Sequence, residues 1–326
     1  MSPKRVGITM GDPSGIGPEI IVRTLNEMQP EKRSQNIVIG NIKFLERAND
    51  MVGSDLEFCD SLSVDPGVVP VVHIETIGAD SIKDGVVNAG SGEAVYRYVR
   101  EASSLISDDK IAAIVTAPLS KSAMHMAGHK YDGHTELLAE LTGAPATYML
   151  LAGPRLSAIH VTTHTSLANA AVDPTIRRVL DTIRIGNQHF KDVGYASPRL
   201  AVAGLNPHCG EGGLFGDEEA KRLIPAVAQA KAEGINVEGP ISGDTVFYRA
   251  LNGEFDLVVA QYHDQGHIPT KLIGFNETVN VSLGLPICRT SVDHGTAFDI
   301  AWKGIADHTN MTAAIAYAHK ILKIND

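Results

Sequence analysis

The sequence predicts an α/β protein with a largely parallel sheet, and three observations lead to this fold class. Short apolar runs rich in valine and isoleucine recur along the chain and alternate with segments of helical period. Many of these runs are apolar throughout, which is typical of strands buried on both faces of a sheet. The 326 residues contain no internal repeat and no Pro- or Ser-rich linker, which favours two lobes sharing a sheet over separate domains.

The predicted strands are the runs that combine β-branched residues with flanking turn residues. They are expected at residues 5–11, 36–41, 111–118, 146–153, 156–164, 199–208, 256–264 and 279–284.

Amphipathic helices are predicted between these strands. The clearest follows Asp173 and Pro174, which suit an N-cap and a first helical position, and its apolar stripe begins at Ile176. Pro225 lies inside another helical pattern and predicts a kink or a late start there. The remaining helices are expected at 14–28, 87–107, 134–143, 217–234 and 309–324.

The composition excludes several classes of protein. A net charge of −10 without a basic run argues against nucleic acid or an anionic membrane as a partner. The apolar stretches are too short to span a membrane, and the N-terminus lacks a secretory signal, so a cytoplasmic location is expected. Three widely spaced cysteines without a CxxC pair argue against a disulfide framework and a zinc knuckle.

Three histidines stand at corresponding places, the carboxyl ends of predicted strands: His164 in VTTH, His208 in GLNPH and His263 in AQYHD. In open parallel sheets, ligands collect beyond these ends. Three converging imidazoles would form a metal site with open positions, and Asp264 is placed to orient His263. The alternative is a set of unrelated, hydrogen-bonded histidines, because the chain has 13 and no pattern such as HExxH fixes the spacing.

Two glycine-rich segments are candidate ligand loops. In residues 204–219, Gly210, Gly212 and Gly213 allow a tight loop that approaches a ligand closely, whereas the three acids that follow fit an ordinary capped helix. Residues 11–19 lack the Walker lysine and the GxGxxG spacing. They indicate either an anion site at a helix N-terminus or a plain tight turn between strand and helix.

His134 and Thr135 open the helix predicted at 134–143. An imidazole, a hydroxyl and backbone N–H groups at a helix start suit a carboxylate or a phosphate. Thr135 is equally well explained as a simple N-cap.

The stretch 262–301 is dense in polar groups set between apolar runs and is the best candidate active site in the chain. It contains Lys271, Asn280 and Arg289, the local cations and amide that an acidic protein needs to bind an anion. Arg289 would grip a phosphate or carboxylate with two nitrogens, while Lys271 would act as a point charge or as an acid.

Several of these motifs are similar to those of one known family. They resemble the 4-hydroxythreonine-4-phosphate dehydrogenase family of vitamin B6 biosynthesis, over residues 5 to about 320. Trp302 is a departure, since a glycine is more usual there. The motifs are MGDPSGIGPEI, TAPLSK, GHTELLA, GLNPHCGEGG, YHDQG and GLPICRTSVDHGTAFDIA.

The resemblance implies an isocitrate/isopropylmalate dehydrogenase-like fold with two interleaved α/β/α lobes and a cleft between them. The approximate lobes are residues 1–130 with 265–326, and residues 131–264. It also implies a homodimer whose active site uses residues of both subunits.

The resemblance further implies roles for single residues. His164, His208 and His263 bind one divalent metal ion, and the substrate is bound by His134, Thr135, Lys271, Asn280 and Arg289. We expect Lys271, as a proton donor or relay, and Asp264 to be the catalytic residues.

The implied reaction is oxidation of a small phosphorylated hydroxy acid by NAD or NADP, followed by decarboxylation and assisted by Zn, Mg, Mn or Co. Candidate substrates are D-threonate or D-erythronate 4-phosphate and 4-hydroxythreonine 4-phosphate. Residues 128–136 and 262–271 look more like the sugar-acid branch, and His267 could face the C2 substituent. The other classes are a metal-dependent hydrolase and a binding module without chemistry.

Overall fold

The computed structural model describes residues 4–172 and 174–324 and confirms the α/β fold class. The chain divides into two compact units, unit 1 (residues 1–147 and 285–326) and unit 2 (residues 148–284). Both boundaries lie later in the chain than the approximate lobes expected from the sequence. The reason is packing: α6 (His134–Thr142) contacts α4 (Ala89–Ser107) of unit 1, whereas α11 (His263–Gly274) contacts strands of unit 2.

The sheet of unit 1 has the order β3-β4-β2-β1-β5-β12, and its described pairings are all parallel. Strands β1, β2 and β5 are buried at every residue, as their continuous apolar runs predicted. The strands are β1 (Val6–Thr9), β2 (Asn36–Gly40), β3 (Phe58–Asp60), β4 (Val69–His73), β5 (Ala113–Thr116) and β12 (Cys288–Ser291).

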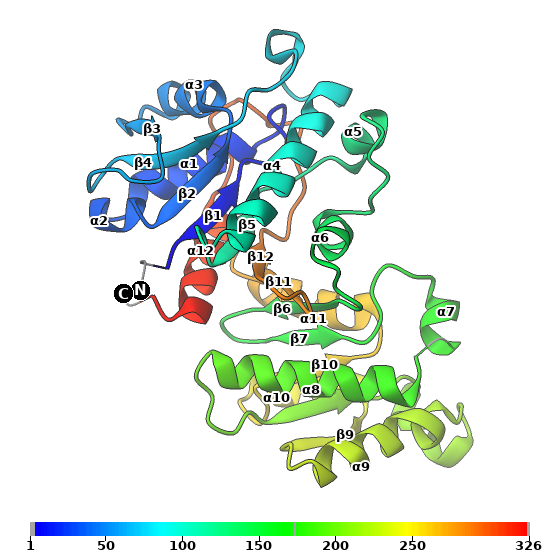
Figure 1. Cartoon of the computed structure of the whole chain (residues 1–326). Helices are drawn as coiled ribbons and strands as arrows, with labels where there is room; N and C mark the ends of the chain where they lie inside the picture. Colours follow the sequence, from blue (N-terminus) through cyan, green and yellow to red (C-terminus); the bar gives the residue numbers. More distant parts are fainter. Residues whose placement is uncertain (1–3, 173, 325–326) are drawn as a thin grey trace. The chain divides into compact units, whose positions relative to one another are not determined.

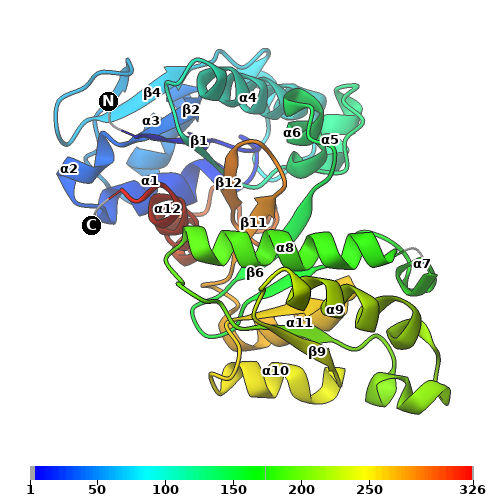
Figure 2. The same cartoon turned by 60° about the horizontal axis from the view of Figure 1, so that its bottom comes forward.

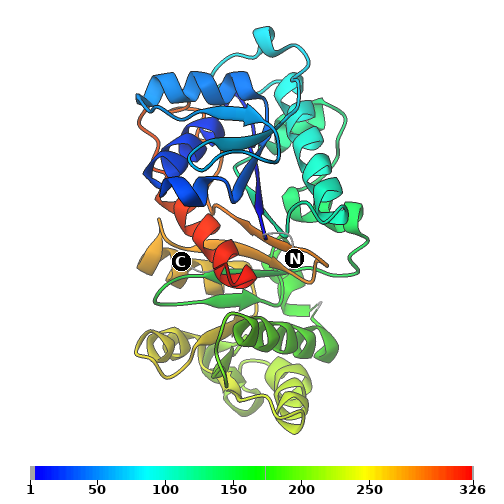
Figure 3. The same ribbon diagram turned by 60° about the vertical axis from the view of Figure 1, so that its left-hand side comes forward.

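Helices cover both faces of this sheet (Figures 1 and 3). Helices α1, α3 and α12 lie along one face, where α1 contacts both of the others, and α4 lies on the opposite face against β1 and β2 with α5 and α6 beside it. The helices of unit 1 besides α4 and α6 are α1 (Gly17–Glu27), α2 (Pro30–Arg33), α3 (Ile42–Val52), the 3₁₀ turn Ala79–Ser81, α5 (Lys121–Met126) and α12 (Thr309–Leu322).

The sheet of unit 2 has the order β11-β6-β7-β10-β8-β9. Strands β7, β10, β8 and β9 are parallel neighbours, and β6 runs antiparallel to β7 and to β11. The largely parallel sheet predicted from the sequence is therefore confirmed. The strands are β6 (Tyr148–Ala152), β7 (Ala158–His160), β8 (Leu200–Ala203), β9 (Val237–Ile241), β10 (Leu257–Ala260) and β11 (Val279–Leu283).

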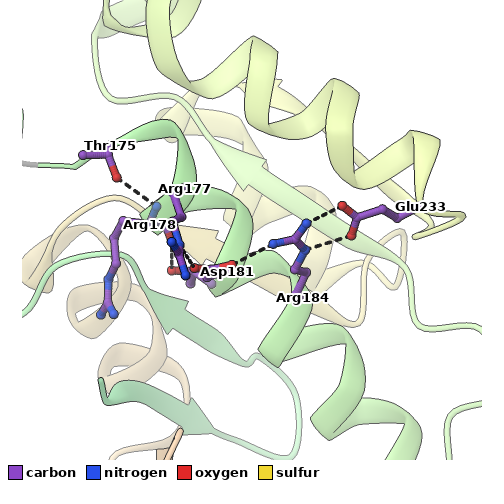
Figure 4. A network of polar contacts seen from close by, with 7 residues as sticks. Thr175, Arg177, Arg178, Asp181, Arg184 and Glu233 are labelled. Carbon is purple, nitrogen blue, oxygen red and sulfur yellow. Dashed lines mark hydrogen bonds and ion pairs between the residues drawn. The ribbon is translucent and has the colours of Figure 1, made fainter. Parts of the chain in front are cut away.

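Helices also cover this sheet on both faces (Figure 2). Helix α8 packs on β7, β10 and α9, while α10 and α11 pack on the strands from the other side. Arg184 of α8 donates to both carboxylate oxygens of Glu233, at 2.8 and 2.5 Å, and so joins α8 to the end of α9 (Figure 4). The elements besides α11 are α7 (Leu167–Val172), α8 (Ile176–Asp192), the 3₁₀ segment Pro207–Gly213, the π-helical turn Glu219–Leu223, α9 (Ile224–Ala232) and α10 (Gly243–Leu251).

Helix starts differ from the sequence prediction at one place and match it at another. Helix α8 begins at Ile176, and its N-cap is Thr175, whose hydroxyl accepts from the backbone N–H of Arg178 at 3.1 Å. Pro174 therefore precedes the helix instead of opening it. Asp173, the predicted cap, lies outside the described residues. Pro225 falls in the first turn of α9 after the π-helical turn, which confirms the late start. Across the described residues, the helices are too short or too polar to cross a membrane.

Candidate active site

The three histidines predicted to bind metal follow three neighbouring parallel strands of unit 2. His164 follows β7, His263 follows β10 and His208 follows β8, and β10 lies between the other two strands in register. The carboxyl ends of parallel strands meet at one edge of a sheet, so all three side chains belong to the same edge. Among residues 4–172 and 174–324, however, His, Cys, Asp and Glu side chains form no group of three close enough to hold a metal ion as placed.

His164 and His263 line one pocket of about 550 Å³ together with Asp264. Their ring centroids are 6.0 Å apart. The Nδ1 atom of His263 lies 2.7 Å from Oδ1 of Asp264, so this carboxylate orients the imidazole as the sequence predicted. With Nδ1 engaged, Nε2 is the nitrogen of His263 left to bind a ligand.

His208 lines a second pocket of about 640 Å³, to which Asp264 and Tyr262 also contribute. It stands in a tight loop where His208, Cys209 and Gly210 all have left-handed backbone, with φ of 51°, 55° and 80°. The prediction of a tight glycine loop is confirmed, because a Cβ atom on Gly210 would lie 2.7 Å from the carbonyl oxygen of Gly216.

Glu219 anchors this loop, a role that the sequence analysis missed. Its side chain is buried, and its Oε1 atom accepts from the backbone N–H groups of Leu205 and Asn206, at 2.8 and 2.7 Å. Its Oε2 atom accepts from Nδ2 of Asn206 at 2.9 Å. The interpretation of the acids at 217–219 as ordinary helix-start residues was therefore wrong for Glu219, because its carboxylate satisfies loop donors that would otherwise lack partners.

Two further predicted residues lie elsewhere in unit 2. Lys271 is on α11, two turns after His263, and its Nζ atom is 5.5 Å from the centroid of the Phe275 ring. Asn280 is on β11 opposite Leu151 of β6, and its Oδ1 atom is buried without a hydrogen-bond partner among the described residues.

His267, which was expected to face a substrate substituent, is buried at 7% exposure and is not among the described residues lining either pocket. Its ring stacks on His263 with centroids 3.5 Å apart and an interplanar angle of 12°. It also contacts His160, a fully buried histidine that the sequence analysis did not single out.

In unit 1 the structure brings Arg289, Thr135 and His134 together. Arg289 on β12 is buried, and its Nη2 atom donates to Oγ1 of Thr116 at 2.7 Å while Nη1 donates to Oγ1 of Thr135 at 3.4 Å. Burial lowers the pKa of Arg289 to about 10, so the guanidinium stays charged at neutral pH. A buried guanidinium beside hydroxyls and the first turn of a helix suits an anion.

His134 is the first residue of α6 and is also buried. Burial and the nearby charge of Arg289 hold the pKa of His134 well below its usual range. Its Nε2 atom has no hydrogen-bond partner among the described residues. A neutral imidazole with an unsatisfied polar atom at a helix start leaves one group able to bind a ligand.

The segment 11–19 forms a tight turn. A Cβ atom on Gly11 would lie 2.4 Å from the carbonyl oxygen of Pro118, and buried Asp12 accepts from the backbone N–H of Ser14 at 2.9 Å. The predicted tight turn is therefore present, and a buried acid such as Asp12 is an unfavourable neighbour for an anion. Trp302 has a left-handed φ of 59°, which accords with glycine being more usual there, and its Nε1 atom donates to the carbonyl of Pro13 at 2.9 Å.

Comparison with known proteins supports a dehydrogenase. Residues 32–318 match the family described as pyridoxal phosphate biosynthetic protein PdxA. The chain is 47% identical over 318 residues to a D-threonate 4-phosphate dehydrogenase of Cupriavidus necator, with 95% of each chain covered. It is 47% identical over 325 residues to a 4-hydroxythreonine-4-phosphate dehydrogenase of Geobacter metallireducens, with 98% of this chain and 96% of the relative covered.

Solved structures agree with these relatives. A 4-hydroxythreonine-4-phosphate dehydrogenase from Klebsiella pneumoniae matches with a TM-score of 0.87 and 44% identity, covering 98% of this chain and 99% of that chain. An isocitrate dehydrogenase from Methylococcus capsulatus matches with a TM-score of 0.50 and 16% identity, covering 98% of this chain and 86% of that chain. The second match concerns the fold alone, and it confirms the isocitrate dehydrogenase-like class.

Proposed function

The chain belongs to the family of the pyridoxal phosphate biosynthetic protein PdxA, and from this membership we propose that it oxidises a 4-phosphorylated 3-hydroxy acid. It is an enzyme of the dehydrogenase class, like the relatives it matches over nearly its whole length. The observation that carries the proposal is the set of three histidines that follow the carboxyl ends of β7, β10 and β8. The relatives favour this reaction over the hydrolase and binding-module alternatives.

We assign His164, His208 and His263 as the ligands of one divalent metal ion. The donor chemistry fits, because three imidazoles stand at one sheet edge and Asp264 orients the middle one through Nδ1. When bound, Zn, Mg, Mn or Co would supply a Lewis acid that lowers the pKa of the substrate hydroxyl.

We assign the substrate phosphate to Arg289 and Thr135, with His134 as a further contact. Support comes from the burial of Arg289, whose guanidinium is held by Thr116 and Thr135 hydroxyls in a fixed orientation. A planar guanidinium held in this way binds two phosphate oxygens at once, which a lysine cannot do. Asn280, whose buried oxygen has no hydrogen-bond partner in the part of the chain that the structure describes, is proposed as an acceptor for a substrate hydroxyl.

Lys271 is proposed to supply or relay the proton that the reaction exchanges. It shares α11 with His263, so one helix carries both the proposed ligand and the proposed acid. NAD or NADP would serve as the hydride acceptor, the resulting 3-oxo acid would lose carbon dioxide, and a proton would then be needed at the carbon that lost it. Asp264, the other residue expected to be catalytic, is proposed to act by orienting His263.

Among the candidate substrates we propose D-threonate 4-phosphate or D-erythronate 4-phosphate first, and 4-hydroxythreonine 4-phosphate second. Relatives named for D-threonate 4-phosphate and for 4-hydroxythreonine 4-phosphate are equally similar, at 47% identity. The order therefore rests on the segments 128–136 and 262–271, which look more like the sugar-acid branch.

We also propose that the chain forms a homodimer through α11. Ile268, Leu272 and Phe275 are 63%, 83% and 63% exposed and share one side of this helix. Soluble proteins rarely leave a stripe of large apolar side chains open to water. A homodimer that buried this stripe would place α11, and with it His263 and Lys271, at the interface.

A panel assay tests the proposed function. The purified protein would be offered the three phosphorylated acids with NAD or NADP, each with Zn, Mg or Mn, while the absorbance of reduced nicotinamide is followed. We expect turnover with at least one acid, and its loss after chelation of the metal. Absence of reduced nicotinamide with every combination, together with phosphate release, would contradict the proposal and favour a hydrolase.

A further inference from the structure

A column of three histidine rings, formed by His160, His267 and His263, lies in unit 2. His160 is the last residue of β7 and is fully buried, whereas His267 and His263 are one turn apart on α11. The ring centroids of His263 and His267 are 3.5 Å apart, and those of His160 and His267 are 4.6 Å apart. The two inner rings have no part in the proposed reaction.

Carbonyl oxygens fix the protonation of both inner rings. The Nδ1 atom of His160 lies 3.1 Å from the carbonyl oxygen of Met149, and the Nδ1 atom of His267 lies 3.0 Å from that of His263. A carbonyl only accepts, so both Nδ1 atoms carry the proton. The unprotonated Nε2 atom of His160 lies 3.1 Å from Nδ1 of His267 and accepts a hydrogen bond from the Nδ1–H group of His267.

Both inner rings are buried, and an unpaired charge there would be costly, so each ring carries a single N–H group. Neutral rings in these tautomers form an ordered chain of donors and acceptors from Met149 through His160 to His267, without a buried charge.

Gly266 has no side chain, and the ring of His160 occupies the space where a Cβ atom would lie. A Cβ atom at this position would lie 2.3 Å from Nε2 of His160 and 3.1 Å from Cβ of Ala260. Since His160 is fully buried at the end of β7, its ring has no room to move away. The glycine of YHDQGH therefore allows an imidazole of the sheet to reach the helix that carries His263.

We propose that His160 is a positioning residue of the candidate metal site. It holds His267 through the Nδ1–H group, and the stacked ring of His267 fixes the plane of His263, whose own Nδ1 is engaged by Asp264. The link to metal rests on the proposed function, whereas the order of the rings rests on the contacts above. Substitution of a residue that orients a metal-binding histidine typically weakens metal binding about 10- to 100-fold.

The first test reads the tautomers directly, in metal-free protein labelled with ¹⁵N-histidine and observed by NMR. We expect the Nδ1–H form for both His160 and His267. In His160→Phe the Nδ1–H group of His267 loses one of its two acceptors but keeps the carbonyl of His263, so the Nδ1–H form should persist while its nitrogen and proton signals shift. In His160→Gln the side-chain amide can still accept from His267, so these signals should stay close to those of the wild type.

The second test measures Co2+ affinity from the absorbance of the bound ion. His160→Phe and Gly266→Ala should bind Co2+ about 10- to 100-fold more weakly, and His160→Gln should lie closer to wild type. His189→Phe, which replaces another buried histidine of unit 2, is the control for loss of a buried imidazole and should bind as wild type does.

The outcomes separate this inference from the proposed function. An Nε2–H tautomer of His267 in the wild type would overturn the positioning role, and so would unchanged His267 signals and unchanged Co2+ affinity in His160→Phe. A wild type that binds no Co2+ would overturn the proposed metal site, while the NMR comparison would still decide whether His160 orders the rings. If His160→Phe does not fold, the wild-type spectrum and His160→Gln supply the same decision.

Discussion

The Nδ1 atom of His263 lies 2.7 Å from a carboxylate oxygen of Asp264, the residue that follows it in the chain. This bond selects the tautomer that leaves Nε2 for a ligand and raises the basicity of the ring. Asp264→Asn retains the shape but removes the charge, so we expect Co2+ affinity to fall about 10- to 100-fold and the metal-dependent oxidation rate to fall with it. Asp244→Asn removes a carboxylate from the pocket of His208 and is the control. Equal losses in both variants would show that only the local negative charge matters.

Arg289 is the second group whose role can be tested by a conservative change. Arg289→Lys retains a positive charge but cannot donate to the Thr116 and Thr135 hydroxyls and grip a phosphate at the same time. We expect KM for the phosphorylated acid to rise about 100-fold, with a smaller change in kcat, because a ground-state contact is lost. Arg184→Lys, in the surface network of Figure 4, should leave KM unchanged. An unchanged KM in Arg289→Lys would remove Arg289 from the substrate site.

Glu219 should matter more than its distance from the reaction suggests. In Glu219→Gln the NH2 group of the new amide would replace one of the two carboxylate oxygens. It would face either Nδ2 of Asn206 or the backbone N–H groups of Leu205 and Asn206, so two donors would oppose each other in both orientations. We expect a loss of about 2 kcal/mol in the free energy of unfolding, measured in urea, and weaker Co2+ binding because the His208 loop loosens. Asp217→Asn, at an exposed position of the same segment, should change neither quantity. Loss of stability without loss of Co2+ affinity would show that the His208 loop does not contribute to the metal site.

The position of His263 was predictable because a buried strand and its carboxyl end leave a clear pattern, an apolar run closed by polar residues. Asp264 was predictable as its orienting partner because it is the next residue. The partners of Arg289 were not readable in this way: Thr116 is 173 residues away and is brought close only by the parallel pairing of β12 with β5.

Two other residues were missed for a different reason. A histidine inside an apolar run, such as His160, resembles any buried side chain, and an acid at a helix start, such as Glu219, resembles an ordinary helix-start carboxylate. The one signal that could have found His160 is Gly266 in the middle of α11, since a glycine inside a helix weakens it unless another group needs the space.

Leu272 tests the proposed homodimer. It is 83% exposed on the apolar side of α11, so Leu272→Glu would place a charge in any interface that buries this stripe. We expect analytical ultracentrifugation to show a homodimer for the wild type and a shift to monomer for the variant, with activity lost in proportion. Ile77→Glu changes an equally apolar exposed residue of unit 1 and should leave the homodimer intact. A monomeric wild type would contradict the proposal.

His134 gives the stability of the protein a defined pH dependence. Its folded-state pKa is lowered, by burial first and by Arg289 second, below the value of about 6.5 that it has in the unfolded chain. Above pH 6.5 the ring is neutral in both states and the full stability is present. As the pH falls below 6.5, the unfolded chain takes up a proton that the folded protein resists, so stability is lost with decreasing pH, by up to about 1.4 kcal/mol per pH unit.

The measurement is the midpoint of thermal unfolding between about pH 8 and about pH 5, the range in which histidine titrates. His134→Gln removes the titrating ring, so its midpoint should fall less with acid than that of the wild type, and the two curves should diverge only below about pH 6.5. Thr135→Val loses a hydroxyl beside Arg289 but no titrating group, so its curve should run parallel to that of the wild type. If His134→Gln also ran parallel to the wild type, the neutral state of His134 would have no part in the acid sensitivity of the fold. Its place in the anion site would then rest on the contacts of Arg289 alone.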